Sequence, residues 1–85
     1  MYTILYKKSA QKSLQRMPRK MALKVIESFK KLAVDPTRKD LDINPLTGRE
    51  GFRLRIGGWR AIYQIEQKRL VTHVLTIGAR GDVYK

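Results

Sequence analysis

Two runs of alternating residues, separated by two glycines, constrain the fold of this chain more than any other feature. Phe52–Ile56 alternates apolar and basic side chains, and Trp59–Glu66 resumes an alternation after Gly57 and Gly58. Successive side chains of a strand point to opposite faces, and two glycines between such runs are typical of a tight turn. The pattern predicts a β-hairpin with one apolar face.

The same alternation places basic side chains on the second face of the hairpin. If its apolar residues point into a core, then Arg53, Arg55 and Arg60 point out together on the other side. Arg80 follows the next expected strand, and Tyr84 comes four residues later. We therefore expect four guanidiniums and one phenol on or beside one sheet face.

The N-terminal half predicts the layer that covers the apolar face. Residues 2–7 are rich in β-branched and aromatic side chains and predict a strand. Two amphipathic helices are expected next, at 9–17 with Ser9 as N-cap and at 19–34, separated at Pro18. This order predicts a helical hairpin directly after a strand.

The C-terminal half predicts a small sheet. Residues 35–51 contain two prolines and two glycines and are expected to form a loop. Residues 70–77 are expected to add a third strand to the hairpin, with brief pairing at 82–84. The whole chain, residues 1–85, then forms a single α+β domain, in which an N-terminal strand and a helical hairpin precede an antiparallel β meander and the helices pack on one face of the sheet.

The net charge of +12 over 85 residues indicates an acidic partner or a polyanion. The basic residues occur in expected helices and strands alike, a distribution that fits a nucleic-acid groove better than a membrane-bound helix. There is no cysteine, which excludes disulfides and cysteine-based zinc sites. The apolar run at the N-terminus is too short for a signal peptide or a membrane span, so we expect a cytoplasmic protein without a membrane partner.

Arginines beside a tyrosine suit the cleavage of RNA by its own 2′-hydroxyl. That reaction needs a base, positive charge for the transition state and an acid for the leaving oxygen. Tyr84 is a candidate base, because neighbouring guanidiniums favour the phenolate. Lys68 and Arg69, in the second expected turn, are candidates for further phosphate contacts. The alternative is that these arginines are only solvated charge, and the net charge favours the functional interpretation.

Other catalytic constellations are weak. His73 shares an expected strand face with Val71 and Ile77, which predicts a packed or edge histidine rather than a catalytic one. Asp40 and Asp42 lie two residues apart in the expected loop with no further candidate ligand, so no metal site is expected. Trp59 is interpreted as a core anchor.

The run PLTGREGFRLRIGGWRAIYQI and the later LTIGARGDVY resemble the RelE/ParE toxins, and the similarity covers essentially the whole chain. The resemblance implies a helical hairpin on a small antiparallel sheet. It implies a cognate antitoxin, acidic or wrapping, as partner. It also implies a toxin that enters the ribosome and cleaves mRNA in the A site, with neither a metal ion nor a small-molecule cofactor.

Residue roles also follow from the resemblance. Arg53 and Arg55 match basic positions that contact phosphate, and Arg60 matches the arginine that stabilises the transition state. Arg80 matches the proposed acid, and Tyr84 resembles the C-terminal tyrosine proposed as base. Together these form the expected catalytic and RNA-binding set.

The similarity departs from the family pattern at two points. Gly51 stands where some RelE-type members have a further lysine, and the sequence ends one residue after Tyr84, without the C-terminal helix of some members. A ParE-type toxin that poisons DNA gyrase shares the fold and is the main alternative. A third possibility is a role within a DNA-bound antitoxin complex, where the antitoxin would read the DNA.

Overall fold

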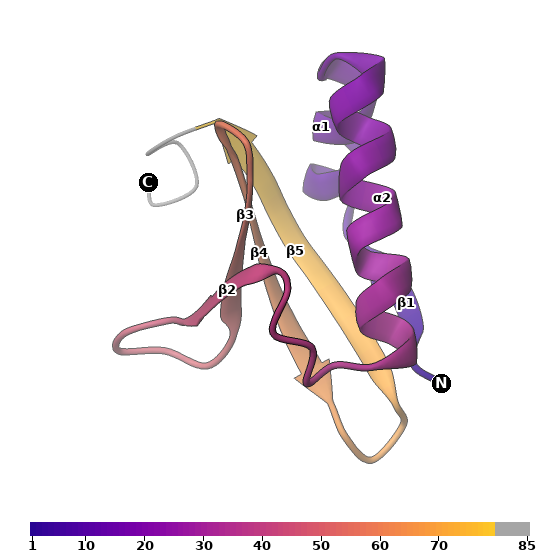
Figure 1. Ribbon diagram of the computed structural model, residues 1–85, viewed down its shortest axis with the longest axis vertical. Coiled ribbons are helices and arrows are strands. Elements are labelled where there is room, and N and C mark those ends of the chain that lie inside the picture. The colour runs from indigo at the N-terminus through magenta and orange to yellow at the C-terminus, as the bar shows by residue number, and fades with distance from the viewer. Residues whose placement is uncertain (80–85) are drawn as a thin grey trace.

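A computed structural model, which describes residues 1–79, forms two helices packed on one face of a five-stranded mixed sheet. Figure 1 shows both helices on the same side of the sheet. The elements follow the chain in the order β1 (Thr3–Tyr6), α1 (Lys8–Arg16), α2 (Arg19–Val34), β2 (Asp42–Pro45), β3 (Phe52–Ile56), β4 (Trp59–Glu66) and β5 (Val71–Ala79). The predicted α+β class is confirmed.

The strand order is β1-β5-β4-β3-β2. The strands β3 to β5 form the predicted antiparallel meander, β2 extends it at one edge, and β1 lies parallel to β5 at the other edge. The sheet therefore joins the two ends of the described chain, because Thr3 pairs with Val71 and Tyr6 with Val74.

The predicted bounds of α2, β3 and β4 are confirmed. Each of these elements has a strong local periodicity, which makes its bounds predictable from the sequence. Three other predictions need correction. The helix α1 begins at Lys8 with Lys7 as N-cap, so Ser9 lies inside the helix. The segment 35–51 is not all loop, because it contains β2, and β5 extends to Ala79. The pairing expected at 82–84 lies outside the described residues.

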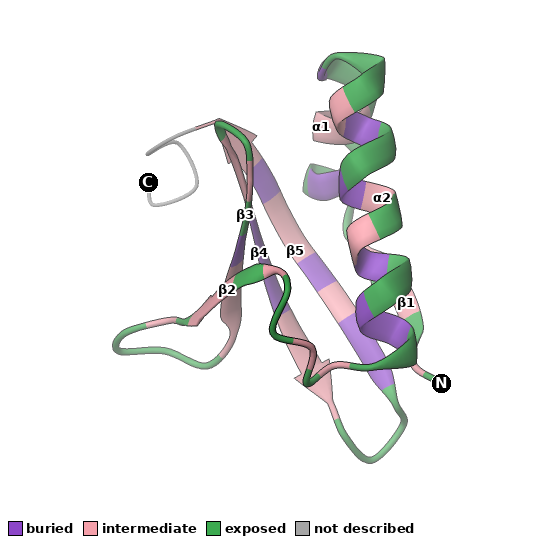
Figure 2. Ribbon diagram, viewed as in Figure 1, coloured by how far each residue is buried: buried purple, intermediate pink, exposed green. Residues whose placement is uncertain are grey.

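The core lies between α2 and the sheet (Figure 2), where the buried residues of the helix face the strands. Its centre is a chain of aromatic contacts. The Phe29 ring meets Tyr6 and Tyr63 edge-on, with centroids 6.0 and 5.3 Å apart, and Tyr63 stacks on Phe52 at 5.4 Å. Burial raises the pKa of both Tyr6 and Tyr63 to about 12, so both remain neutral phenols at physiological pH.

Candidate basic face of the sheet

The register of the β3–β4 hairpin brings three arginines together. Arg55 lies directly opposite Arg60, and Arg53 lies opposite Ile62. Side chains that are opposite each other in an antiparallel pair share a face, with Cβ atoms about 4.5–5.5 Å apart. Leu54 and Ala61 form the intervening pair and belong to the core on the helix side. The predicted parity of the hairpin is therefore confirmed, and the arginines lie on the face that the helices do not cover.

This surface, here named the arginine face, consists of two rows that cross the sheet from β2 to β5. The first row is Asp42, Arg55, Arg60 and Gly78, and the second is Asn44, Arg53, Ile62 and Thr76. Arg55 is exposed, whereas Arg53 and Arg60 are half-buried and Ile62 is only 1% exposed. The arginine face thus combines cationic groups with a buried apolar centre.

Asp42 and Asn44 were missed as part of this face, because the segment 35–51 was expected to be loop. A signal was available in the sequence. Leu41 to Asn44 alternates apolar and polar residues, which is typical of a strand with one buried face. The run is only four residues long, and the prolines and glycines around it favour a loop.

Lys68 and Arg69 do not join the arginine face. Both lie in the turn between β4 and β5, at the opposite end of β4 from Arg60 (Figure 1). The six residues of β4 that follow Arg60 span about 20 Å before the turn that carries Lys68 begins. The two turn residues therefore form a separate cationic position at the other end of the sheet.

The turn has its own ion-pair network. Arg69 donates two hydrogen bonds of 2.7 Å to the carboxylate of Glu66, and His73 Nε2 lies 2.9 Å from Glu66 Oε1. The Arg69 guanidinium, followed by His73, lowers the pKa of Glu66 to about 2. Arg69 is therefore neutralised within its own turn.

The expectation that His73 shares a face with Ile77 is wrong. The register between β4 and β5 shifts after Ile62, so that Ile62 faces Thr76 but Tyr63 faces Val74. The extra residue in β5 is a β-bulge, which inverts the alternation along that strand. Val74 and Ile77 consequently both face the core, and His73 lies on the outer face, half-buried beside Glu66.

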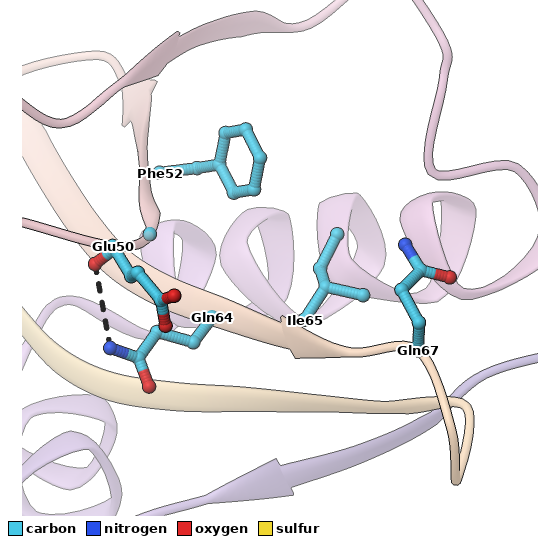
Figure 3. A pocket seen from close by; sticks show the side chains of 6 residues that line it. Glu50, Phe52, Gln64, Ile65 and Gln67 are labelled. Atoms are coloured by element: carbon cyan, nitrogen blue, oxygen red, sulfur yellow. Dashed lines mark hydrogen bonds between the residues drawn. The ribbon is translucent and has the colours of Figure 1, made fainter.

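A hollow of about 330 Å³ lies beside β4, away from the β3–β4 turn (Figure 3). Its lining consists of Glu50, Gly51, Phe52, Gln64, Ile65 and Gln67. Gln64 Nε2 donates to the backbone oxygen of Glu50 at 3.4 Å, which closes one side of the hollow. We assign no chemistry to this hollow, because its amides and single carboxylate lack a partner acid or base within it.

Gly51, the position of the first departure from the family pattern, has a backbone that excludes a side chain. Its φ is +120°, and a Cβ atom there would lie 2.9 Å from the backbone oxygen of Tyr63. The carbonyl of Gly51 also accepts a hydrogen bond from Leu46 N at 3.0 Å. A lysine at this position is therefore incompatible with the observed path between β2 and β3.

The remaining sequence predictions concern the acidic residues of the 35–51 segment, a metal site, the two C-terminal site residues and a membrane span. Asp40 pairs with Arg38 at 2.7 Å, while Asp42 lies on β2. Within residues 1–79, no group of three or more His, Cys, Asp or Glu is arranged to hold a metal ion. Arg80 and Tyr84 lie outside the described residues. No helix in the described part of the chain is long and apolar enough to cross a membrane.

Comparison with known proteins assigns this chain to a family. The model of the ParE toxin of type II toxin–antitoxin systems matches residues 4–84. This chain belongs to the RelE/ParE toxin superfamily. It is the toxin component of a type II toxin–antitoxin system. A search of curated protein sequences found no match.

Solved structures of RelE-type proteins share the fold. The archaeal RelE–RelB complex from Pyrococcus horikoshii matches with 28% identity and a TM-score of 0.82, over 95% of this toxin and 97% of that chain. The RelBE2 complex from Mycobacterium tuberculosis matches with 27% identity and a TM-score of 0.76, over 93% and 98%. The isolated Escherichia coli RelE toxin, at 19% identity and a TM-score of 0.78 over 99% and 92%, shows the fold alone.

Proposed function

We propose that this toxin is a ribosome-dependent endoribonuclease, which cleaves mRNA in the A site without a metal ion and so inhibits translation in the cytoplasm. The observation that carries the proposal is the arginine face. Three guanidiniums on two adjacent strands, on the face away from the helices, form a surface suited to a polyanion. Arginine suits phosphate in particular, because its planar fork donates two parallel hydrogen bonds.

The chemistry follows from the position of each group. The RNA supplies its own nucleophile, because the 2′-hydroxyl attacks the adjacent phosphorus and the 5′-oxygen leaves. Arg53 and Arg55 bind flanking phosphates, and Arg60 stabilises the charge that develops on the transition-state oxygens. We assign the acid and the base to Arg80 and Tyr84, outside the described residues, on the family resemblance.

We also propose a cognate antitoxin as the partner in the inactive state. The archaeal and mycobacterial matches described above are both complexes of a RelE-type toxin with a RelB-type antitoxin. An acidic antitoxin segment that covers the arginine face would offset the net charge of +12 and exclude RNA from the same surface.

A matched pair of arginine variants tests the proposal. Arg60→Ala should reduce mRNA cleavage in a translating extract by about 100-fold, the typical effect of losing one transition-state donor. Arg69→Ala removes the same side chain at the opposite end of β4 and should change cleavage by less than about threefold, since Glu66 already neutralises it. Equal losses in the two variants would contradict the assignment.

The assignments at the C-terminus need a separate test. Arg80→Ala and Tyr84→Phe should each reduce cleavage while leaving the far-ultraviolet circular dichroism spectrum unchanged. Full activity in the double variant would show that neither residue is catalytic. The proposed roles of Arg53, Arg55 and Arg60 would not be affected by that result.

A ParE-type activity against DNA gyrase is the second candidate, and the family model that matches residues 4–84 favours it. The two functions differ in cells. The nuclease predicts growth arrest with transcripts cut in codon register and no DNA damage response. Gyrase poisoning predicts cleaved DNA with intact mRNA, and that result would replace the first proposal.

A further inference from the structure

Two polar side chains of the edge strand β2 border the arginine face. Asp42 lies opposite Arg55 and Asn44 opposite Arg53, so both share the face of the guanidiniums. The strand β2 is the last in the sheet order, so among residues 1–79 no further strand lies beyond these two residues. They form the rim of the arginine face on this side.

The Asp42 carboxylate fixes the orientation of the Asn44 amide. Asn44 Nδ2 donates to Asp42 Oδ1 at 3.1 Å. A carboxylate can only accept, so the amide nitrogen must point towards Asp42 and the amide oxygen must point away. Asn44 therefore retains one N–H donor and its Oδ1 acceptor in a defined arrangement.

We propose that Asn44, held by Asp42, hydrogen-bonds a nucleobase of RNA on the arginine face and sets the base preference of the toxin. The inference rests on the proposed function, because it presumes a single-stranded RNA on that face. Phosphate contacts fix the position of a nucleic acid but carry no sequence information. Recognition of an unstacked base requires donors and acceptors for its edge.

The chemistry of the rim fits this role better than that of the guanidiniums. Arginine donates only, whereas the Asn44 amide offers a donor and an acceptor side by side. Asn44 lies on the strand next to Arg53 and directly opposite it, and Arg53 is a proposed phosphate contact. A nucleotide whose phosphate lies on Arg53 would thus place its base within reach of the rim. Asp42 acts as a positioning residue, because it orients the amide.

Binding of short single-stranded RNAs to the full toxin tests the inference. Oligo-A, oligo-C and oligo-U of equal length should bind the unaltered toxin with affinities that differ by about fivefold to tenfold, the scale of one base-edge contact. Asn44→Ala should reduce these differences to within about twofold, while the mean affinity changes little, because the phosphate contacts remain. Asp42→Ala should reduce them partly, because it frees the amide to rotate.

Gln64→Ala provides the matched control. Gln64 is also an amide on the outer face, but it lies beyond the two rows and donates to the backbone of Glu50. Its loss should leave the base differences intact. Thermal unfolding midpoints close to that of the unaltered toxin would establish that each variant is folded.

The outcomes separate this inference from the proposed function. Unaltered base differences in Asn44→Ala would overturn it, as would equal binding of all three oligomers by the unaltered toxin. In either case, weaker binding by Arg55→Ala would leave the RNA-binding arginine face in place. A toxin that binds none of the oligomers and cuts no mRNA would remove the proposed function and this inference together.

Discussion

The two ends of β4 carry the same kind of side chain in opposite electrostatic settings. Near its first residue, Arg60 lies beside Arg55, and like charges share one sheet face. Beyond its last residue, Arg69 is held by Glu66 through two hydrogen bonds of 2.7 Å, with His73 on the same carboxylate. At the first end two arginines share a row with one carboxylate, Asp42, whereas at the second end a single arginine is held by a carboxylate three residues away.

The role of each arginine therefore depends on its position in the strand register. The number of arginines in the sequence does not determine that role. A guanidinium three residues from a glutamate in a turn has a partner within its own segment. Like charges directly opposite each other cost stability, and here Arg55 and Arg60 share a row in which Asp42 is the single carboxylate. Such a cost is typical of a site that binds a ligand.

The largest expected effect concerns Gly51, where the backbone between β2 and β3 lies against Tyr63 of β4. Gly51→Ala should lower the free energy of unfolding by about 2–3 kcal/mol, because the new Cβ would meet the Tyr63 oxygen at a backbone φ of +120°. Urea denaturation measures the change. Gly58→Ala, where a Cβ meets nothing within 4 Å, should stay within about 0.5 kcal/mol. Equal stability of the two variants would show that the path at Gly51 is not restrictive.

The second effect contrasts the arginines directly. Arg55→Ala should weaken the binding of single-stranded RNA by about tenfold, the value of one charge-assisted hydrogen bond, and lower the slope of log affinity against log salt by about 0.7. Arg69→Ala should leave both quantities nearly unchanged. Fluorescence anisotropy from low to high salt measures the affinity and the slope. Identical slopes for the two variants would show that the two ends of β4 do not differ in RNA binding.

The smallest effect is the pH dependence of the turn. Glu66 has a folded pKa of about 2, below its usual value of 4.5, so its ion pairs add stability above pH 4.5 and lose it as pH falls towards 2. The stability difference between the unaltered toxin and Glu66→Gln should therefore be small at neutral pH and decrease as the pH falls from 4.5 towards 2. Chemical denaturation at several pH values tests this, and a difference that does not decrease over this range would exclude the pairing.

Much of the fold follows from local periodicity. The alternation of Phe52–Ile56 and the 3.6-residue spacing of Arg19–Val34 each identify an element and its buried face without knowledge of its partners. The clustering of Arg53, Arg55 and Arg60 follows as well, because a two-residue turn fixes the register of the hairpin.

The hairpin, the helices and the side on which the arginines lie are thus predictable from the residue pattern, since they depend on contacts between neighbours in the chain. The three-dimensional arrangement, by contrast, established that β1 pairs in parallel with β5 and that a bulge turns His73 outwards. It also decided that β2 places Asp42 and Asn44 on the arginine face, whereas Lys68 and Arg69 lie at the far end. A local alternation, such as that from Leu41 to Asn44, can indicate a strand, but it does not specify the partner of that strand, its register or the position of a bulge.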